Sequence, residues 1–197
     1  MENSLLSYLP DHVLQSIIDY DDVIGIERRM HVVTLFADVS GFTAISEALG
    51  KTGKSGAEEL VRILNSYFDP MIALIRTYGG IIAKFGGDAM TVLFPYDDDN
   101  VDVVVRRAVQ CAVDMQTRMV DYIDIPTSVG AYSLAMKAGL AMGPVLTMTV
   151  GKHGERLEYI VAGEAIDLCA DAEHHADKGD VVLHNALLAH TGPVEIV

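Results

Sequence analysis

The chain has few basic residues and few cysteines. It carries 14 Lys and Arg against 28 Asp and Glu, a formal net charge of −14, and no block of basic residues occurs. A surface that follows nucleic-acid phosphates is therefore not expected, and a polyanionic ligand would need metal ions or a partner's cations. Cys111 and Cys169 each lie within an apolar helical pattern, which gives little support to a disulfide framework or a cysteine metal site and favours a reducing, cytoplasmic compartment.

Long apolar runs and a leader sequence are also missing. Charged residues interrupt every apolar run before about 18 residues, so the sequence predicts neither secretion nor a membrane span. Half of the 197 residues are hydrophobic, enough for the core of one domain. The sequence stops at PVEIV, where a new apolar segment begins, and we expect more chain to follow in the natural protein.

The periodicity of apolar residues predicts one α+β domain over residues 31–197, preceded by a helical lead-in over residues 1–30. Residues 31–39 form a near-continuous apolar run, typical of a central strand covered on both faces. Residues 134–143 and 144–150 indicate a pair of strands with an interruption at Gly143 and Pro144. The complete predicted series has strands at 31–39, 81–85, 90–94, 134–143, 144–150, 157–161 and 181–183 and helices from about 43 and at 57–78, 101–122 and 163–173. Its core order is βαββαβ.

Two aspartates stand where predicted strands end. Asp38 closes the apolar run in FADVSGFT, and Asp88 lies in the glycine-rich link of IIAKFGGDAM. A strand end and the turn of a neighbouring hairpin can meet at one edge of a sheet. Carboxylates that lie close together raise each other's pKa unless a cation separates them, and Mg²⁺ binds carboxylate and phosphate oxygens. Taken singly, Asp38 could instead cap the following helix and Asp88 could be an ordinary turn residue.

The two motifs together resemble the class III nucleotidyl cyclases, and most closely the soluble, bicarbonate-responsive adenylyl cyclases. The resemblance covers about residues 31–184. It implies a ferredoxin-like βαββαβ palm with an extra C-terminal strand and helix. It also implies a head-to-tail dimer of two catalytic domains that holds ATP with two Mg²⁺ or Mn²⁺ ions. The expected reaction is attack of the ribose 3′ oxygen on the α-phosphorus, which gives a 3′,5′-cyclic nucleotide and pyrophosphate.

The resemblance also implies roles for individual residues. Asp38 and Asp88 match the two metal-binding aspartates, and Val39 matches the residue whose backbone carbonyl helps to hold one ion. The positions that match contacts to the triphosphate are Ser40, Gly41, Phe42, Thr43 and Lys137. Of these, Lys137 could equally be a strand-edge lysine kept for solubility.

The sequence departs from the family pattern in the helix after EYIVAG. Asp167 replaces the asparagine that orients the ribose, and Asp171 replaces the arginine that stabilises the transition state. Ile160 stands at a base-contacting position that is usually polar, although Lys84 matches the other base-selecting position. This is the pattern of a first-half domain, which needs a complementary second domain in the same chain or another subunit and is at most weakly active alone or as a homodimer.

A second, degenerate site in the soluble branch binds bicarbonate. Lys84 and Val161 match two of its residues, but Ala170 replaces its arginine, which weakens the expectation of a bicarbonate effector. Two other interpretations stay open. One is a catalytically silent regulatory or dimerisation domain, and the other is the related diguanylate cyclase palm, disfavoured because Ala89 and Met90 follow Asp88. The sequence leaves ATP versus GTP undecided.

Overall fold

A computed structural model of the chain describes residues 24–152 and 157–192. The lead-in helix that the sequence predicts near residues 11–18 lies outside the described residues. The elements are β1 (Glu27–Ser40), α2 (Phe42–Gly50), α3 (Lys54–Thr77), β2 (Ile81–Gly86), β3 (Ala89–Tyr96), α4 (Val101–Arg118), η3 (Met119–Tyr122), β4 (Ile125–Thr127), β5 (Gly130–Tyr132), β6 (Ala135–Gly151), β7 (Leu157–Ala162), α5 (Glu164–His174), β8 (Val181–Leu183), η4 (Asn185–Leu187) and α6 (Leu188–Thr191). This series contains the predicted βαββαβ core with an extra strand and helix.

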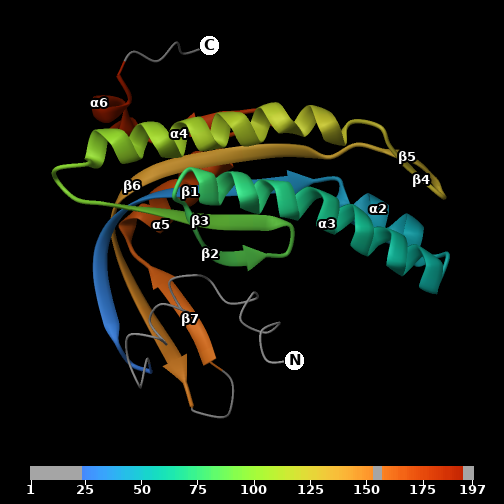
Figure 1. The fold of residues 1–197 in the computed structure, drawn as a ribbon, viewed down its shortest axis with the longest axis horizontal. Helices are drawn as coiled ribbons and strands as arrows, with labels where there is room; N and C mark the ends of the chain where they lie inside the picture. The colour runs from blue at the N-terminus through green and yellow to red at the C-terminus, as the bar shows by residue number, and fades with distance from the viewer. Residues whose placement is uncertain (1–23, 153–156, 193–197) are drawn as a thin grey trace.

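One six-stranded sheet organises the molecule (Figure 1). Its strands lie in the order β2-β3-β1-β6-β7, and β8 pairs in parallel with β6. Strand β1 is central because it pairs with both β3 and β6 in antiparallel register. Its residues 32–35 are fully buried, which confirms the prediction of a strand covered on both faces.

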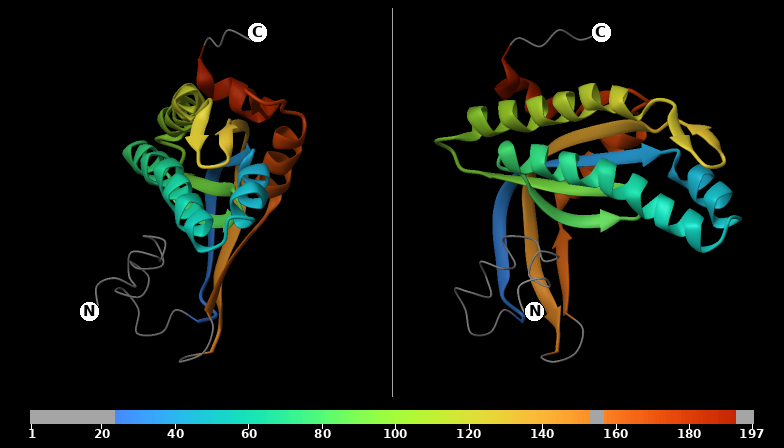
Figure 2. Two further views of the ribbon diagram at one scale, coloured as in Figure 1. Left: turned by 90° about the vertical axis from the view of Figure 1, so that its right-hand side faces the viewer. Right: turned by 45° about the vertical axis from the view of Figure 1, so that its right-hand side comes forward.

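The two faces of the sheet carry different helices. In Figure 2, α3 and α4 lie on one side and α5 lies on the other. Val33, Leu35, Ala37 and Val39 of β1 belong to the core that α3 and α4 cover. Because side chains alternate along a strand, Asp38 points to the face of α5. The Asp38 carboxylate therefore lies on the side of the sheet that α5 covers.

The prediction of two strands within residues 134–150 is wrong. β6 is one strand of 17 residues that continues through Gly143 and Pro144. The reason is β1, which pairs with β6 without a break, Val32 opposite Gly143 and His31 opposite Pro144. The long partner strand keeps the chain extended where the local sequence indicates a turn. Figure 1 shows the two strands curving together.

Three other boundaries differ from the prediction. The long helix begins at Lys54 and includes Pro70 within its 24 residues. Strand β1 begins four residues earlier than predicted, at Glu27. Residues 125–132, to which the sequence analysis assigns no strand, form the hairpin of β4 and β5. None of these differences moves Asp38 or Asp88.

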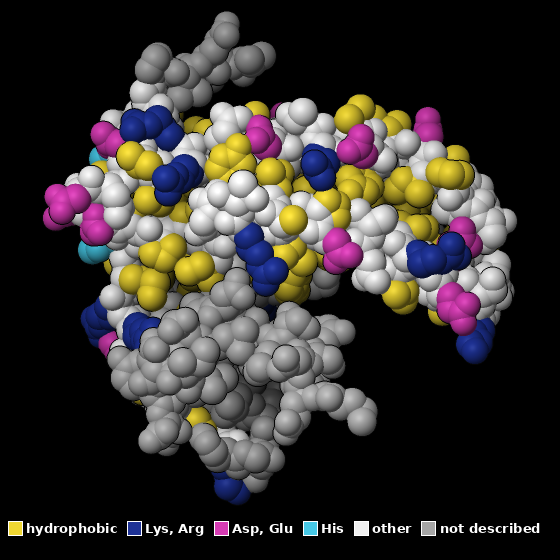
Figure 3. All heavy atoms as spheres, viewed as in Figure 1, with side chains coloured by type: hydrophobic (Ala, Val, Ile, Leu, Met, Phe, Trp, Pro, Cys, Tyr) yellow, Lys and Arg dark blue, Asp and Glu magenta, His cyan; other side chains and the backbone are white. Residues whose placement is uncertain are grey.

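The surface carries mixed charge. On the face seen in Figure 3, basic side chains over α3 and α4 alternate with acidic and hydrophobic ones and form no basic patch. In the described part of the chain, no helix combines the length and the apolar character that crossing a membrane requires.

Candidate functional site

Asp38 and Asp88 come together at the edge of the sheet where β1 ends. Ala37 pairs with Met90, so Asp38 lies one residue and Asp88 two residues beyond the last paired position of β1 and β3. Three influences raise the pKa of the Asp38 carboxyl: burial first, then the negative charges of Glu173 and of Asp88. The charge of Lys137 and a hydrogen bond from the backbone N–H of Val39 oppose this rise. Negative charge is therefore in excess at this edge.

The chemistry of these donors fits a hard divalent cation. Among the residues that the structure describes, no cluster of three or more His, Cys, Asp or Glu side chains is arranged to hold a metal ion. Two carboxylates are nevertheless sufficient for Mg²⁺, which commonly takes one or two protein carboxylates and completes its shell with water and substrate phosphates. A bound cation would also relieve the repulsion that raises the pKa of Asp38. Asp38 and Asp88 thus supply the kind of carboxylate ligands that Mg²⁺ or Mn²⁺ takes from a protein.

The turn after Asp38 exposes backbone amides. Gly41 precedes α2 with a φ of 113°, and a Cβ there would lie 2.5 Å from the carbonyl oxygen of Ser133, so only glycine fits. No side chain caps α2, which excludes Asp38 as its cap. The first helical hydrogen bond runs from the Ile45 N–H to the Gly41 carbonyl, so the preceding amides have no acceptor within the helix. Such a helix start suits phosphate oxygens.

A hollow of about 400 Å³ joins this turn to the hairpin that carries Asp88. The side chain of Phe42 is buried, and the Ser40 hydroxyl donates a hydrogen bond of 3.3 Å to the Ala135 carbonyl oxygen. The residues around the hollow come from α2, α3 and the turn between β2 and β3, and they are Phe42, Thr43, Ser46, Glu47, Leu60, Leu64, Gly87 and Asp88. The helix start and one metal-ligand candidate therefore border the same space.

Lys137 lies beside Asp38 on the same face of the sheet. The two residues are cross-strand partners in the pairing of β1 with β6. The Lys137 Nζ lies 2.8 Å from the Oε1 of Glu173, and these side chains are 29% and 19% exposed. This hydrogen bond is the main cause that raises the pKa of Lys137. The structure thus places Lys137 beside Asp38, and the sequence analysis assigns no role to its partner Glu173.

Glu173 could have been noticed from the pattern of α5. The buried residues Ala165, Cys169 and Ala172 define the inward stripe of this helix. Glu173 follows Cys169 by four positions and so borders that stripe. A carboxylate on the inward side of a helix needs a partner, since burying an unpaired charge is costly. That partner is Lys137.

Three of the four residues predicted for a base or bicarbonate site meet around one pocket of about 330 Å³. Lys84, Ile160 and Val161 line it, together with Glu158. Ala170 is exposed on α5 and is not among the lining residues. Because Glu158 also lines the pocket, the pocket is less favourable for an anion than one in which Lys84 were the only charged residue.

Asp167 and Asp171 lie on the outward side of α5. Both are exposed, whereas Ala165 and Cys169 pack inward. The carboxylate of Asp171 lies 3.8 Å from the Nδ1 of His175, its neighbour one turn on. Neither side chain takes part in the buried packing of α5 against the sheet.

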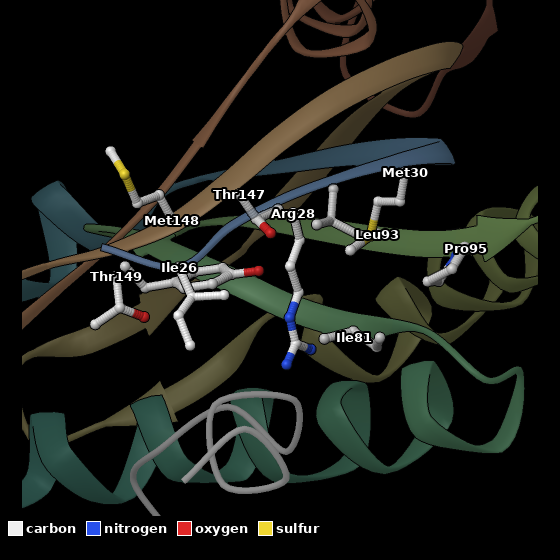
Figure 4. Close-up of a pocket in the computed structure, with 10 residues that line it drawn as sticks. Ile26, Arg28, Met30, Ile81, Leu93, Pro95, Thr147, Met148 and Thr149 are labelled. Carbon is white, nitrogen blue, oxygen red and sulfur yellow. The ribbon is translucent and has the colours of Figure 1, made fainter. Parts of the chain in front are cut away.

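A further pocket lies far from this edge. Its volume is about 190 Å³, and apolar residues such as Met30 and Leu93 line it with Arg28 (Figure 4). Arg28 precedes Asp38 by ten positions on the same strand, which at about 3.3 Å per residue places them roughly 33 Å apart along β1. This pocket is not part of the candidate site.

Comparison with known proteins supports one family for the whole fold. The family model described as "Adenylate and Guanylate cyclase catalytic domain" matches residues 24–190. The chain is 30% identical over 181 residues to mouse adenylate cyclase type 10, covering 91% of this chain but 11% of that protein. It is 33% identical over 149 residues to an adenylate cyclase of Anabaena cylindrica, covering 74% of this chain and 27% of the relative.

Solved structures agree with these relatives. The guanylyl cyclase Cya2 superposes with a TM-score of 0.68 at 31% identity, covering 84% of this chain and 80% of that one. The adenylyl cyclase CyaB from P. aeruginosa superposes with a TM-score of 0.66 at 24% identity, covering 83% and 81%, and this supports the fold alone. The chain spans only a small part of the length of the curated relatives that it matches. It belongs to the adenylate and guanylate cyclase catalytic domain family.

Proposed function

We propose that this chain is the metal-binding and triphosphate-binding half of an adenylate cyclase. With a complementary second domain, it converts ATP to 3′,5′-cyclic AMP and pyrophosphate. The observation that carries the proposal is the meeting of Asp38 and Asp88 beside an uncapped helix start. Relatives named adenylate cyclases support ATP as the substrate, while the likeness to a guanylyl cyclase keeps GTP as the alternative.

In this mechanism, Asp38 and Asp88, with help from the backbone carbonyl of Val39, would hold two Mg²⁺ or Mn²⁺ ions. When bound, such ions would supply the positive charge that favours ionisation of the attacking 3′-hydroxyl and departure of pyrophosphate. The amides of residues 40–43 bind phosphate oxygens, and the small Gly41 lets the backbone approach them. Lys137 adds a positive charge on the same face as Asp38.

The other half of the reaction comes from a partner domain. An arginine and an asparagine are the groups that the family uses for the transition state and the ribose, and the matching positions here are Asp171 and Asp167. Two carboxylates near a triphosphate oppose the reaction by repulsion. We therefore assign the transition-state donors and the base pocket to a second catalytic domain.

The pocket that Lys84, Ile160 and Val161 line has a smaller part in this proposal. Ile160 offers no hydrogen bond to a purine, and Glu158 shares the pocket with Lys84. With Ala170 outside the pocket, we expect bicarbonate to have little effect on this chain. A catalytically silent dimerisation domain is the competing function. The carboxylate pair argues against it, because an excess of negative charge without a bound cation has no structural use here.

Direct metal binding tests the proposal. Mn²⁺ is titrated into the chain and followed by its electron paramagnetic resonance signal, for wild type, Asp38→Asn and Asp88→Asn. Each substitution removes one anionic ligand, and we expect at least a tenfold loss of affinity, consistent with the several kcal/mol that such charge interactions supply. Asp69→Asn is the control, since Asp69 is an exposed aspartate on α3. Equal Mn²⁺ affinity in all four proteins would reject the metal site.

A further inference from the structure

A third acidic residue, Glu173, stands at the proposed site without a role in it. It comes from α5, whereas Asp38 and Lys137 come from neighbouring strands. Its Oε1 accepts a hydrogen bond of 2.8 Å from the Lys137 ammonium group. Its charge also acts on Asp38. One carboxylate therefore contacts the lysine and influences the neighbouring metal-ligand candidate.

The position of Glu173 is fixed by close packing between α5 and β6. A Cβ at Gly139 would lie 2.3 Å from the backbone N of Glu173 and 2.7 Å from the carbonyl oxygen of Cys169. The Sγ of Cys169 lies 3.1 Å from the carbonyl oxygen of Gly139 and 3.3 Å from that of Thr34, so its single S–H is shared between these two acceptors. The backbone of α5 is thus held against β6. This close packing places Glu173 near Lys137, which precedes Gly139 by two residues on β6.

A lysine at this place needs such a contact to point in one direction. Its four-carbon stem is flexible, and ordering it costs rotamer entropy. Asp38 alone does not fix it, because the carboxylate of Asp38 is also needed for a metal ion. Glu173 is 19% exposed, and a charge-assisted hydrogen bond in such a shielded place is stronger than one at the open surface.

We propose that Glu173 is a positioning residue of the cyclase site: it holds the Lys137 ammonium group beside Asp38, where the phosphates of the nucleotide bind. Glu173 touches neither substrate nor metal in this inference and acts through Lys137. The inference rests on the proposed function, because it assumes that a nucleotide lies in front of Asp38.

A double-mutant cycle tests this. The Mg²⁺ complex of a non-hydrolysable ATP analogue is titrated calorimetrically into the chain paired with a competent second domain. The variants are Glu173→Gln, Lys137→Met and both together. We expect Glu173→Gln to weaken nucleotide affinity by roughly 3- to 10-fold, and to have no further effect once Lys137→Met is present, because coupled residues are not additive. Glu173→Asp, which keeps the charge but loses the reach, should resemble Glu173→Gln.

The control is Glu164→Gln, the same chemical change at an exposed position of the same helix. If Glu173→Gln binds nucleotide as Glu164→Gln does, the positioning role is overturned. It is also overturned if the loss persists in the Lys137→Met background, or if Glu173→Asp binds like wild type. Asp38→Asn distinguishes a failure of the proposed function from a failure of this inference alone. Unchanged Mn²⁺ binding in that variant rejects the proposed function and this inference with it. Weakened Mn²⁺ binding there, with a silent Glu173→Gln, rejects the inference alone.

Discussion

Asp38 is a residue whose charge the fold disfavours. Burial, Glu173 and Asp88 together raise its pKa above that of an ordinary aspartate, despite the attraction of Lys137. A carboxyl whose pKa is higher in the folded than in the unfolded protein stabilises the fold while it is protonated. That contribution is complete below the unfolded pKa and is lost as the pH rises through the folded pKa. At neutral pH, the ionised Asp38 therefore makes the metal-free domain less stable.

This gives a prediction for stability. In the absence of divalent metal, Asp38→Asn should unfold at a higher temperature than wild type at pH 7.5, by a few degrees at most. The difference should shrink as the pH falls through the raised pKa of Asp38, because the wild-type carboxyl then becomes neutral as well. Thermal unfolding followed by circular dichroism over pH 4 to 8 checks this. A lower midpoint for Asp38→Asn at pH 7.5, or a difference independent of pH, would contradict it.

The sequence predicts the candidate site unevenly. Asp38, Asp88 and the turn at Gly41 are predictable because short local motifs fix them: a strand end, a hairpin turn and a helix start. The contact between Glu173 and Lys137 is not predictable in this way. It depends on how closely α5 approaches β6, and only the structure shows that Gly139 makes this approach possible.

Among the elements, α5 and β6 determine the shape of the site more than any single side chain. The strand has a glycine where the helix backbone rests, and this contact carries Glu173 toward Lys137. The fold order was predictable from apolar periodicity, but the continuity of β6 was not. Gly143 and Pro144 locally indicate a turn, and the long-range pairing with β1 overrides that preference.

Gly139→Ala tests the contact between these elements. The added Cβ would lie 2.3 Å from backbone, which cannot move as a flexible side chain does. We expect a loss of roughly 1–3 kcal/mol in the free energy of unfolding, as for other overpacked interiors, measured by urea denaturation. Nucleotide affinity should fall as well, since Glu173 moves away from Lys137. Gly50→Ala is the matched control, because nothing lies within 4 Å of a Cβ there. Equal stability of the two variants would show that α5 packs differently.

For the whole molecule, the proposed function assigns the inward side of α5 to its own domain and the outward side to the contact with a partner domain. The inward side packs on the sheet and supplies Glu173, and the outward side presents Asp167 and Asp171. In a homodimer, the sheet edge that carries Asp38 and Asp88 in each copy would face the carboxylates of Asp167 and Asp171 from the other copy. Nucleotide binding could survive this arrangement while the chemistry fails.

Restoring the missing groups should therefore produce activity in a homodimer. Asp167→Asn, Asp171→Arg and Ile160→Thr together supply the amide, the cation and a polar base contact. One preorganised donor is typically worth roughly 10²–10³ in rate, so we expect an increase of at least that size in cyclic AMP formation. The triple variant that also carries Asp88→Asn is the control. An increase that survives Asp88→Asn would not come from this site.

The half-site assignment is tested most directly by the rate of cyclic AMP formation from Mg²⁺-ATP. The rate is measured for the purified chain alone and after addition of a second-half cyclase domain that carries the asparagine and the arginine. We expect the chain alone to be almost inactive and the mixture to be faster by roughly 10²-fold or more, with the gain lost in Asp38→Asn. If the chain alone turns over ATP as fast as the mixture, the assignment is wrong, and residues other than those of a partner domain complete the site.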